Sequence, residues 1–130
     1  MRAKAIRNTF EGCPPAIAAI GSPESQTHLS LGMEYEVFAL SVFQGVVFLQ
    51  VVVDASHITW LPAWFFEVCE PTVPDDWICS LPRENLQMVL GPKSVAADES
   101  SYNRMVELDP ESVAAFWQRV DAKVHAEQEP

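Results

Sequence analysis

The sequence predicts an α+β domain in which a bent antiparallel sheet, or a small β-barrel, is covered by a C-terminal amphipathic helix. Three observations indicate this fold class: an uncharged run rich in Val and Phe over residues 37–53, a Gln-Gly dipeptide in its middle, and a helix-start signal followed by an apolar stripe. The 130 residues correspond to a single domain, 1–130, long enough to bury about two-thirds of the unfolded chain's surface. We expect the core to span about 29–126 and residues 127–130 to form a frayed tail.

The uncharged run predicts a β-hairpin. Two β-rich segments, Glu34–Phe43 and Val46–Asp54, flank Gln44-Gly45, which suits a tight two-residue turn. In that register one face is apolar throughout, and the other is mixed but still too apolar for open water. We therefore expect both faces to be covered. The apolar face holds Phe38, Leu40, Val42, Val47, Leu49, Val51 and Val53, and the mixed face holds Tyr35, Val37, Ala39, Ser41, Phe43, Val46, Phe48, Gln50, Val52 and Asp54.

Weaker patterns place the remaining strands and loops. Residues 1–10 predict a first strand, and residues 11–30, with several Gly and Pro, predict an irregular connection. Pro62 marks a strand start or a bulge, because it cannot donate to a ladder. The further predicted elements are strands at Ala63–Val68, Trp77–Leu81 and Leu86–Leu90, a polar loop at 93–104 with one helical turn near its end, and a short strand at Met105–Leu108.

The C-terminal helix has a clear start. Asp109 is a good N-cap, Pro110 suits the first helical position and Glu111 places an acid in the first turn. The apolar residues that follow recur with helical spacing and form one stripe. We expect a helix from about Pro110 to about Ala126, with the stripe at Val113, Phe116, Trp117, Val120 and Val124.

The charge is strongly acidic, with 8 Lys and Arg against 18 Asp and Glu and a net charge of −10. Such a surface repels phosphate, which argues against binding to nucleic acid or to anionic membranes. Residues 8–82 contain nine acids and no Lys or Arg. Two interpretations stand: a well-solvated surface, or an electric field that steers a basic protein partner.

The sequence also argues against several common kinds of site. Three cysteines (Cys13, Cys69 and Cys79) without a Cys-x-x-Cys motif predict buried, reduced thiols in a cytoplasmic protein, with neither a disulfide framework nor a zinc site. The five glycines are too scattered for a phosphate-binding loop, so we expect no cofactor. We see no signal peptide, and the 17-residue run is too short and too polar for a membrane span of about 20 residues.

Catalysis has one candidate pair, Asp54 and His57, in the turn after the hairpin. The aspartate could orient the histidine as a general base for a small hydrolase. A solvated turn with a local hydrogen bond explains the same residues, and no nucleophile or oxyanion device accompanies them. We therefore expect a protein that is not an enzyme.

A cluster of aromatic and acidic residues predicts a binding surface instead. Tryptophans are enriched in protein interfaces, and here they lie among acids within a short window. The predicted contact residues are Trp60, Glu67, Glu70, Asp75, Asp76 and Trp77. An alternative is a scaffold subunit that buries the mixed hairpin face in a homodimer.

Part of the chain resembles a known class of small proteins. The segments Leu31-Gly32-x-x-Tyr35-x-Val37, Pro62-Ala63-x-x-Phe66-Glu67-Val68 and Val73-Pro74-Asp75-Asp76-Trp77 are similar to those of SH3-like small β-barrels. They also resemble small bacterial proteins of the immunity type, which are encoded beside toxins. The resemblance covers about residues 29–81. It implies a non-enzymatic inhibitor that binds one cognate toxin, and the acidic charge suits a basic toxin.

Overall fold

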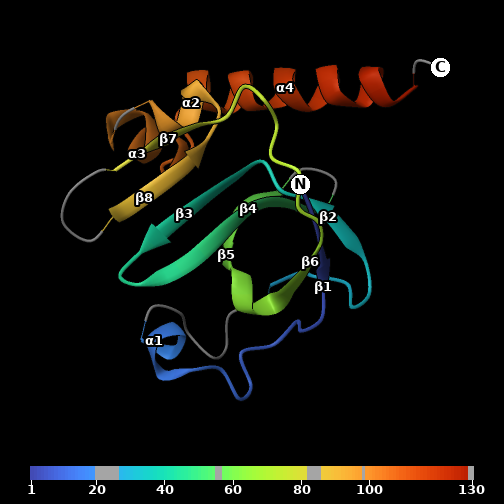
Figure 1. The fold of residues 1–130 in the computed structure, drawn as a ribbon, viewed down its shortest axis with the longest axis vertical. Coiled ribbons are helices and arrows are strands. Elements are labelled where there is room, and N and C mark those ends of the chain that lie inside the picture. Colours follow the sequence, from blue (N-terminus) through green and yellow to red (C-terminus); the bar gives the residue numbers. More distant parts are fainter. Residues whose placement is uncertain (20–26, 55–56, 82–85, 98, 129–130) are drawn as a thin grey trace.

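A computed structural model describes residues 1–19, 27–54, 57–81, 86–97 and 99–128 of the chain. It shows an α+β arrangement of two antiparallel sheets and several helices (Figure 1). The predicted fold class is confirmed at this level.

The larger sheet contains β3 (Ala39–Phe43), β4 (Val46–Asp54), β5 (His57–Pro62), β7 (Ile78–Ser80) and β8 (Leu86–Gly91), in the spatial order β5-β4-β3-β8-β7. The predicted hairpin forms its centre, with Phe43 opposite Val46. Gln44 and Gly45 both have a positive φ, 50° and 76°. This is the pattern of a type I′ turn, whose twist matches that of the two strands. The prediction of a two-residue Gln-Gly turn is confirmed.

The smaller sheet contains β1 (Arg2–Ala5), β2 (Glu34–Glu36) and β6 (Phe66–Glu70), in the order β2-β1-β6. The predicted strand Glu34–Phe43 is therefore two strands in two sheets. Val37 and Phe38 are both buried, at 1% and 8% exposure, although neighbours in a strand point to opposite faces. The chain passes from one sheet to the other at this point.

The predicted strand Ala63–Val68 is wrong in its first half. Strand β5 ends at Pro62, and a 3₁₀ turn, η1 (Ala63–Phe65), leads into β6. Phe65 and Phe66 are successive and both buried, at 0% and 7% exposure. A regular strand cannot bury both on one side, whereas a turn between two sheets can.

The helices are α1 (Pro15–Ala18), α2 (Lys93–Ala96), α3 (Glu99–Val106) and α4 (Pro110–Gln128). The predicted start of α4 is confirmed, because the carboxylate of Asp109 accepts a hydrogen bond from the backbone N–H of Ser112 at 3.3 Å. Helix α4 extends to Gln128, so residues 127–128 belong to it, while 129–130 lie outside the described residues.

The polar loop predicted at 93–104 and the short strand predicted at Met105–Leu108 are wrong, because α2 and α3 occupy most of this segment. The helical turn expected near the end of the loop is confirmed, since residues 100–104 lie within α3. Helix propensity here is weak, but Val95 and Met105 are almost fully buried in the core, at 2% and 1% exposure. Packing against the sheet, and not local propensity, explains these short helices.

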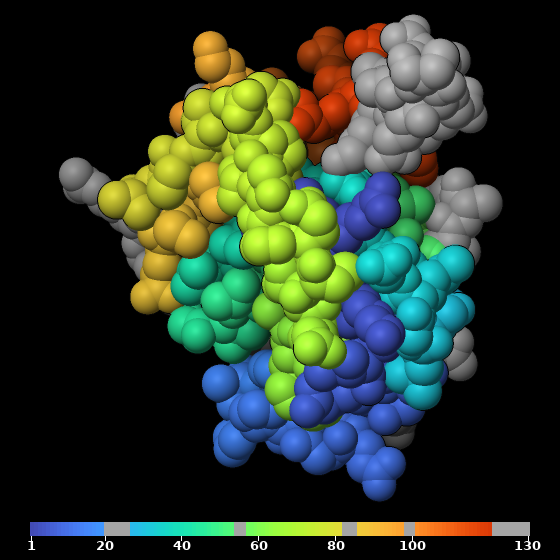
Figure 2. All heavy atoms as spheres, turned by 45° about the vertical axis from the view of Figure 1, so that its right-hand side comes forward, coloured from blue at the N-terminus to red at the C-terminus, as the bar shows by residue number. Residues whose placement is uncertain are grey.

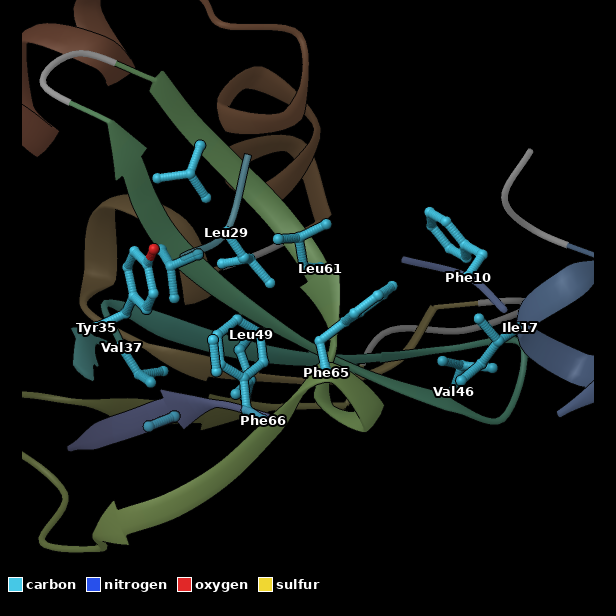
Figure 3. Packing of buried hydrophobic residues seen from close by; sticks show 14 of the residues in the cluster. Phe10, Ile17, Leu29, Tyr35, Val37, Val46, Leu49, Leu61, Phe65 and Phe66 are labelled. Atoms are coloured by element: carbon cyan, nitrogen blue, oxygen red, sulfur yellow. The ribbon is translucent and has the colours of Figure 1, made fainter. Parts of the chain in front are cut away.

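Two hydrophobic clusters lie on opposite sides of the larger sheet. The first joins it to the smaller sheet, with Phe65 near its centre (Figure 3). Phe10 and Ile17 pack into this cluster from the N-terminal segment, and the rings of Phe10 and Phe65 meet edge to face at 5.0 Å. The core therefore begins well before residue 29, which corrects the predicted boundary.

The second cluster lies beneath the helices. Phe116 of α4 is 4% exposed, and its ring is 5.0 Å from that of Phe38. Val120 is half-buried against the same cluster. The C-terminal helix packs on the sheet as predicted, and both faces of the hairpin are covered.

The described part of the chain contains no closed barrel. Each sheet keeps two edge strands: β5 and β7 in the larger sheet, and β2 and β6 in the smaller. The chain leaves the larger sheet at η1 and enters the smaller one, so the strands do not close into a single ring. Of the two predicted forms, the bent antiparallel arrangement is the one observed.

Candidate functional site

Charged residues cover the outer face of the smaller sheet. Along β1 the alanines point inward, while Arg2 and Lys4 are exposed. Both neighbouring strands present acids to them. Arg2 is opposite Glu36 and Glu70, and Lys4 is opposite Glu34 and Glu67. Opposite charges across strands stabilise a sheet by about 0.2–1 kcal/mol for each pair.

The start of the chain supplies cations to these acids. The amino group of Met1 lies 3.4 Å from Glu36 and 3.5 Å from Glu70, and Arg2 Nε lies 3.3 Å from Glu36. The absence of Lys and Arg from residues 8–82 therefore does not leave Glu36 and Glu70 unpaired. Partners distant in sequence neutralise part of the predicted acidic surface.

Strand β6 carries a bulge at Cys69. Val68 pairs with Ala3 and Glu70 with Arg2, so Cys69 is the extra residue. Its Sγ donates a hydrogen bond to Glu34 Oε1 at 3.1 Å. This hydrogen bond to a carboxylate raises the pKa of the Cys69 thiol, with further contributions from desolvation and from the carboxylate's charge. The thiolate is disfavoured, so the site does not activate Cys69 as a nucleophile.

Acids in the segment after β6 differ in their surroundings. Glu70 accepts a hydrogen bond from the backbone N–H of Thr72 at 2.9 Å. The hydroxyl and the N–H of Thr72 hold the pKa of Glu70 below its usual range. Asp76 binds Arg119 of α4 through both carboxylate oxygens, one of them 2.8 Å from Nη2. This bidentate pair raises the pKa of Arg119. Asp75 is exposed.

The four predicted acids Glu67, Glu70, Asp75 and Asp76 lie along one segment. Figure 2 shows this part of the chain, in yellow-green, as a ridge across one face of the molecule, beside β1. We call residues 67–76 the β6 ridge. The structure thus brings the four acids onto one continuous surface.

The two predicted tryptophans are not on the β6 ridge. Trp77 is 8% exposed and belongs to the first core cluster, so it offers little surface to a partner, and its assignment as a contact residue is corrected. Trp60 is half-buried on β5 in the other sheet, with its ring 5.4 Å from that of Tyr102. The turn at η1 separates Trp60 from the four acids. Trp77 directly follows Asp76 in the sequence, but its side chain turns into the core.

Two valines on the β6 ridge were missed by sequence reasoning. Val68 is 48% exposed and Val73 is 39% exposed. Val68 lies on the opposite side of its strand from Glu67 but stays open because β6 is an edge strand. No feature of the sequence indicates that β6 is an edge strand. The exposure of Val68 could therefore not be predicted from the sequence.

The Asp54–His57 pair lies at the turn between β4 and β5, where the two residues are register partners. The side chain of Asp54 is outside the described residues. His57 is exposed, and its ring stacks on that of His28 at 6.0 Å. An open hollow of about 360 Å³ beside His57 is otherwise lined by apolar residues, so its described lining supplies no nucleophile. The lining comprises His57, Ile58, Leu108, Pro110, Val113 and Trp117.

Other predicted features also find their place. Cys13, Cys69 and Cys79 are free thiols as predicted, but Cys13 is half-buried and the other two are exposed, so the prediction of burial is wrong. The mixed hairpin face proposed for a homodimer is covered within the chain: Ser41 and Gln50 on it are fully buried.

Among the described residues, no group of three or more His, Cys, Asp and Glu is placed to hold a metal ion. No helix within the described residues has the length and apolar character needed to cross a membrane. Comparison with protein-family models, with curated proteins and with solved structures found no match for the chain.

Proposed function

We propose that the protein is a non-enzymatic binding protein that inhibits a basic partner, a cognate bacterial toxin, through the β6 ridge. One observation carries the proposal. Glu67 and Asp75 form no ion pair with any described residue, although Lys4 is opposite Glu67 in register, and the exposed Val68 and Val73 lie between the two acids in sequence. Free carboxylates beside exposed apolar side chains suit a partner that presents Lys or Arg around an apolar contact.

The edge position of β6 supports the same function. An edge strand presents backbone N–H and C=O groups to which an extended segment of a partner can add. The acids along β6 oppose pairing between two copies of this chain, because like charges would meet. A basic partner strand meets no such repulsion.

The proposal keeps the immunity-type resemblance and bases it on surface chemistry, not on a closed barrel. A cytoplasmic location accompanies this proposal, because free thiols stay reduced there. Inhibition requires only that the β6 ridge covers the toxin's working surface.

The test first takes as the candidate toxin any basic protein found among the products of the neighbouring genes, and then measures its association kinetics with this chain. Glu67→Lys together with Asp75→Lys should slow association at low salt, and the difference should shrink as ionic strength reduces the screening length to about 8–10 Å. Asp76 is left intact because it holds α4. The matched control is Glu11→Lys with Glu107→Lys, two exposed acids outside the ridge.

The valines test the apolar part of the contact. Val68→Ala with Val73→Ala should leave association almost unchanged and speed dissociation. Urea unfolding of every variant shows whether the fold is intact. If all variants are folded, and the ridge variants associate and dissociate at the same rates as the control variants, the β6 ridge is only a solvated surface and the proposal fails.

A further inference from the structure

A separate hollow lies between the tip of the β3–β4 hairpin and helix α3. Its volume is about 260 Å³, and it is open to solvent. The lining is four aromatic rings with two residues at the rim of α3: Phe43, Phe48, Trp60, Tyr102, Asn103 and Val106. None of its described lining residues belongs to the β6 ridge. Figure 1 shows the hairpin tip and α3 on the left of the view and β6 to their right.

Three strands and one helix bring the rings together. Ser41 and Phe48 are register partners, and Trp60 pairs with Gln50, two residues along β4 from Phe48. Tyr102 reaches over this face from α3. Its hydroxyl is 3.3 Å from that of Ser41, and its ring is 5.4 Å from the Trp60 ring at a tilt of 57°. Two rings at this angle form a corner of an aromatic box.

The rings remain partly open. Phe43, Phe48, Trp60 and Tyr102 are all half-buried, and Val106 is 49% exposed. Burial raises the pKa of the Tyr102 phenol, so its ring stays uncharged near neutral pH. None of the six described lining residues is Lys or Arg. A cation that enters the hollow therefore meets aromatic rings and no like charge from this lining.

We propose that this hollow binds a trimethylammonium group, as carried by choline or glycine betaine. Aromatic boxes attract quaternary ammonium ions because ring faces are electron-rich, and the attraction increases when water is excluded. The net charge of −10 concentrates cations around the molecule.

A trimethylammonium group fits this lining better than other charged groups do. A lysine ammonium is strongly hydrated and has three N–H groups to satisfy, whereas only Tyr102 and Asn103 carry side-chain acceptors in the described lining. An anion would oppose the net charge of the chain. The inference does not depend on the function proposed for the β6 ridge.

The test compares choline with 3,3-dimethylbutan-1-ol, a neutral molecule of the same shape. Titration calorimetry and ¹⁵N-resolved chemical shifts on the full chain measure both ligands. Choline should bind at least about tenfold more tightly, and the shifts should centre on Trp60 and Tyr102. Equal binding of the two molecules would show an apolar pocket only, and no binding of choline at millimolar concentration would also overturn the proposal.

Rim variants test the charge without changing the rings. Val106→Glu should tighten choline binding and Val106→Lys should weaken it, with little change for the neutral alcohol, because Val106 is exposed and either side chain can be solvated. Trp60→Leu should abolish preferential binding of choline, whereas Trp64→Leu, at a tryptophan outside the hollow, should not. If both Val106 variants are folded and bind choline with unchanged affinity, the proposal that the hollow recognises a cation is wrong.

Discussion

Gln50 is the most informative position for a stability test. Its side chain is 0% exposed, and neither amide atom hydrogen-bonds to any described residue. It stands on the face of β4 that the helices cover, between Ala39 and Trp60 in register. We predict that Gln50→Met stabilises the protein, because methionine has a similar unbranched shape and no polar atoms to satisfy.

The magnitude follows from the burial. A buried polar group without a partner costs about 1–3 kcal/mol in protein mutants. Replacing the amide by a thioether removes that cost and adds apolar contact with the second core cluster. We expect the free energy of unfolding to rise by about 1–3 kcal/mol. The exposed Gln118→Met is the control, with an expected change within about 0.5 kcal/mol.

Urea unfolding followed by circular dichroism measures both variants. The midpoint should rise for Gln50→Met while the slope stays the same, which shows that stability and not compactness has changed. A loss of more than 1 kcal/mol would mean that the Gln50 amide is well bonded, and the reasoning from its isolation would fail.

Three further predictions use other local features. Leu108→Gly should stabilise the protein by about 0.5–1 kcal/mol in urea unfolding, because Leu108, two residues after the end of α3, has φ 56°, a conformation that glycine adopts without strain; a loss would show that its exposed side chain is needed. Alkylation of Cys69 at pH 8, resolved by peptide mass spectrometry, should be faster in Glu34→Gln, because removing the carboxylate lowers the raised thiol pKa and increases the thiolate; an unchanged rate would contradict that cause. Gly91→Ala should destabilise the protein by about 1–3 kcal/mol, because a Cβ there would lie 2.9 Å from that of Ala39; a melting temperature equal to that of the parent chain would show that β3 and β8 can shift apart.

The sequence predicted those elements whose signals are local. The Gln44-Gly45 turn and the Asp109-Pro110 helix start each depend on the conformational preferences of a few adjacent residues. The strands at 78–80 and 86–91 follow from short β-rich runs bounded by breakers. Each of these elements is where the pattern places it, within a few residues.

Elements that depend on tertiary packing were missed. The switch between sheets at Val37-Phe38 and the turn at η1 both occur inside runs that look like continuous strands. The sequence signal for such a break is a pair of adjacent apolar residues that a single strand face cannot bury together. Phe65-Phe66 is such a pair. Helices α2 and α3 are stabilised by residues such as Met105 that pack on a sheet formed elsewhere in the chain.

In the candidate site, too, local features were predictable from the sequence and tertiary contacts were not. Exposure of Glu67, Glu70, Asp75 and Asp76 follows from their charge, so their place at the surface was predictable. Their ion-pair partners were not, because Arg2 and Arg119 stand 34 and 43 residues from Glu36 and Asp76, the acids they bind. Such pairs exist only once the fold has brought the ends of the chain to the middle.

The acids of this surface fall into two groups: those that form ion pairs within the chain, and those that remain available to a binding partner. Glu36 and Glu70 fix the first residue of the chain, and Asp76 fixes α4 through Arg119. Exposed ion pairs contribute at most about 1 kcal/mol each, yet they occupy the carboxylates that a partner would otherwise use. Glu67 and Asp75 have no such role among the described residues. A basic partner therefore gains most from these two acids, one in β6 and one in the loop that follows it, and a mutational scan of the β6 ridge should find the largest effects on association rate there.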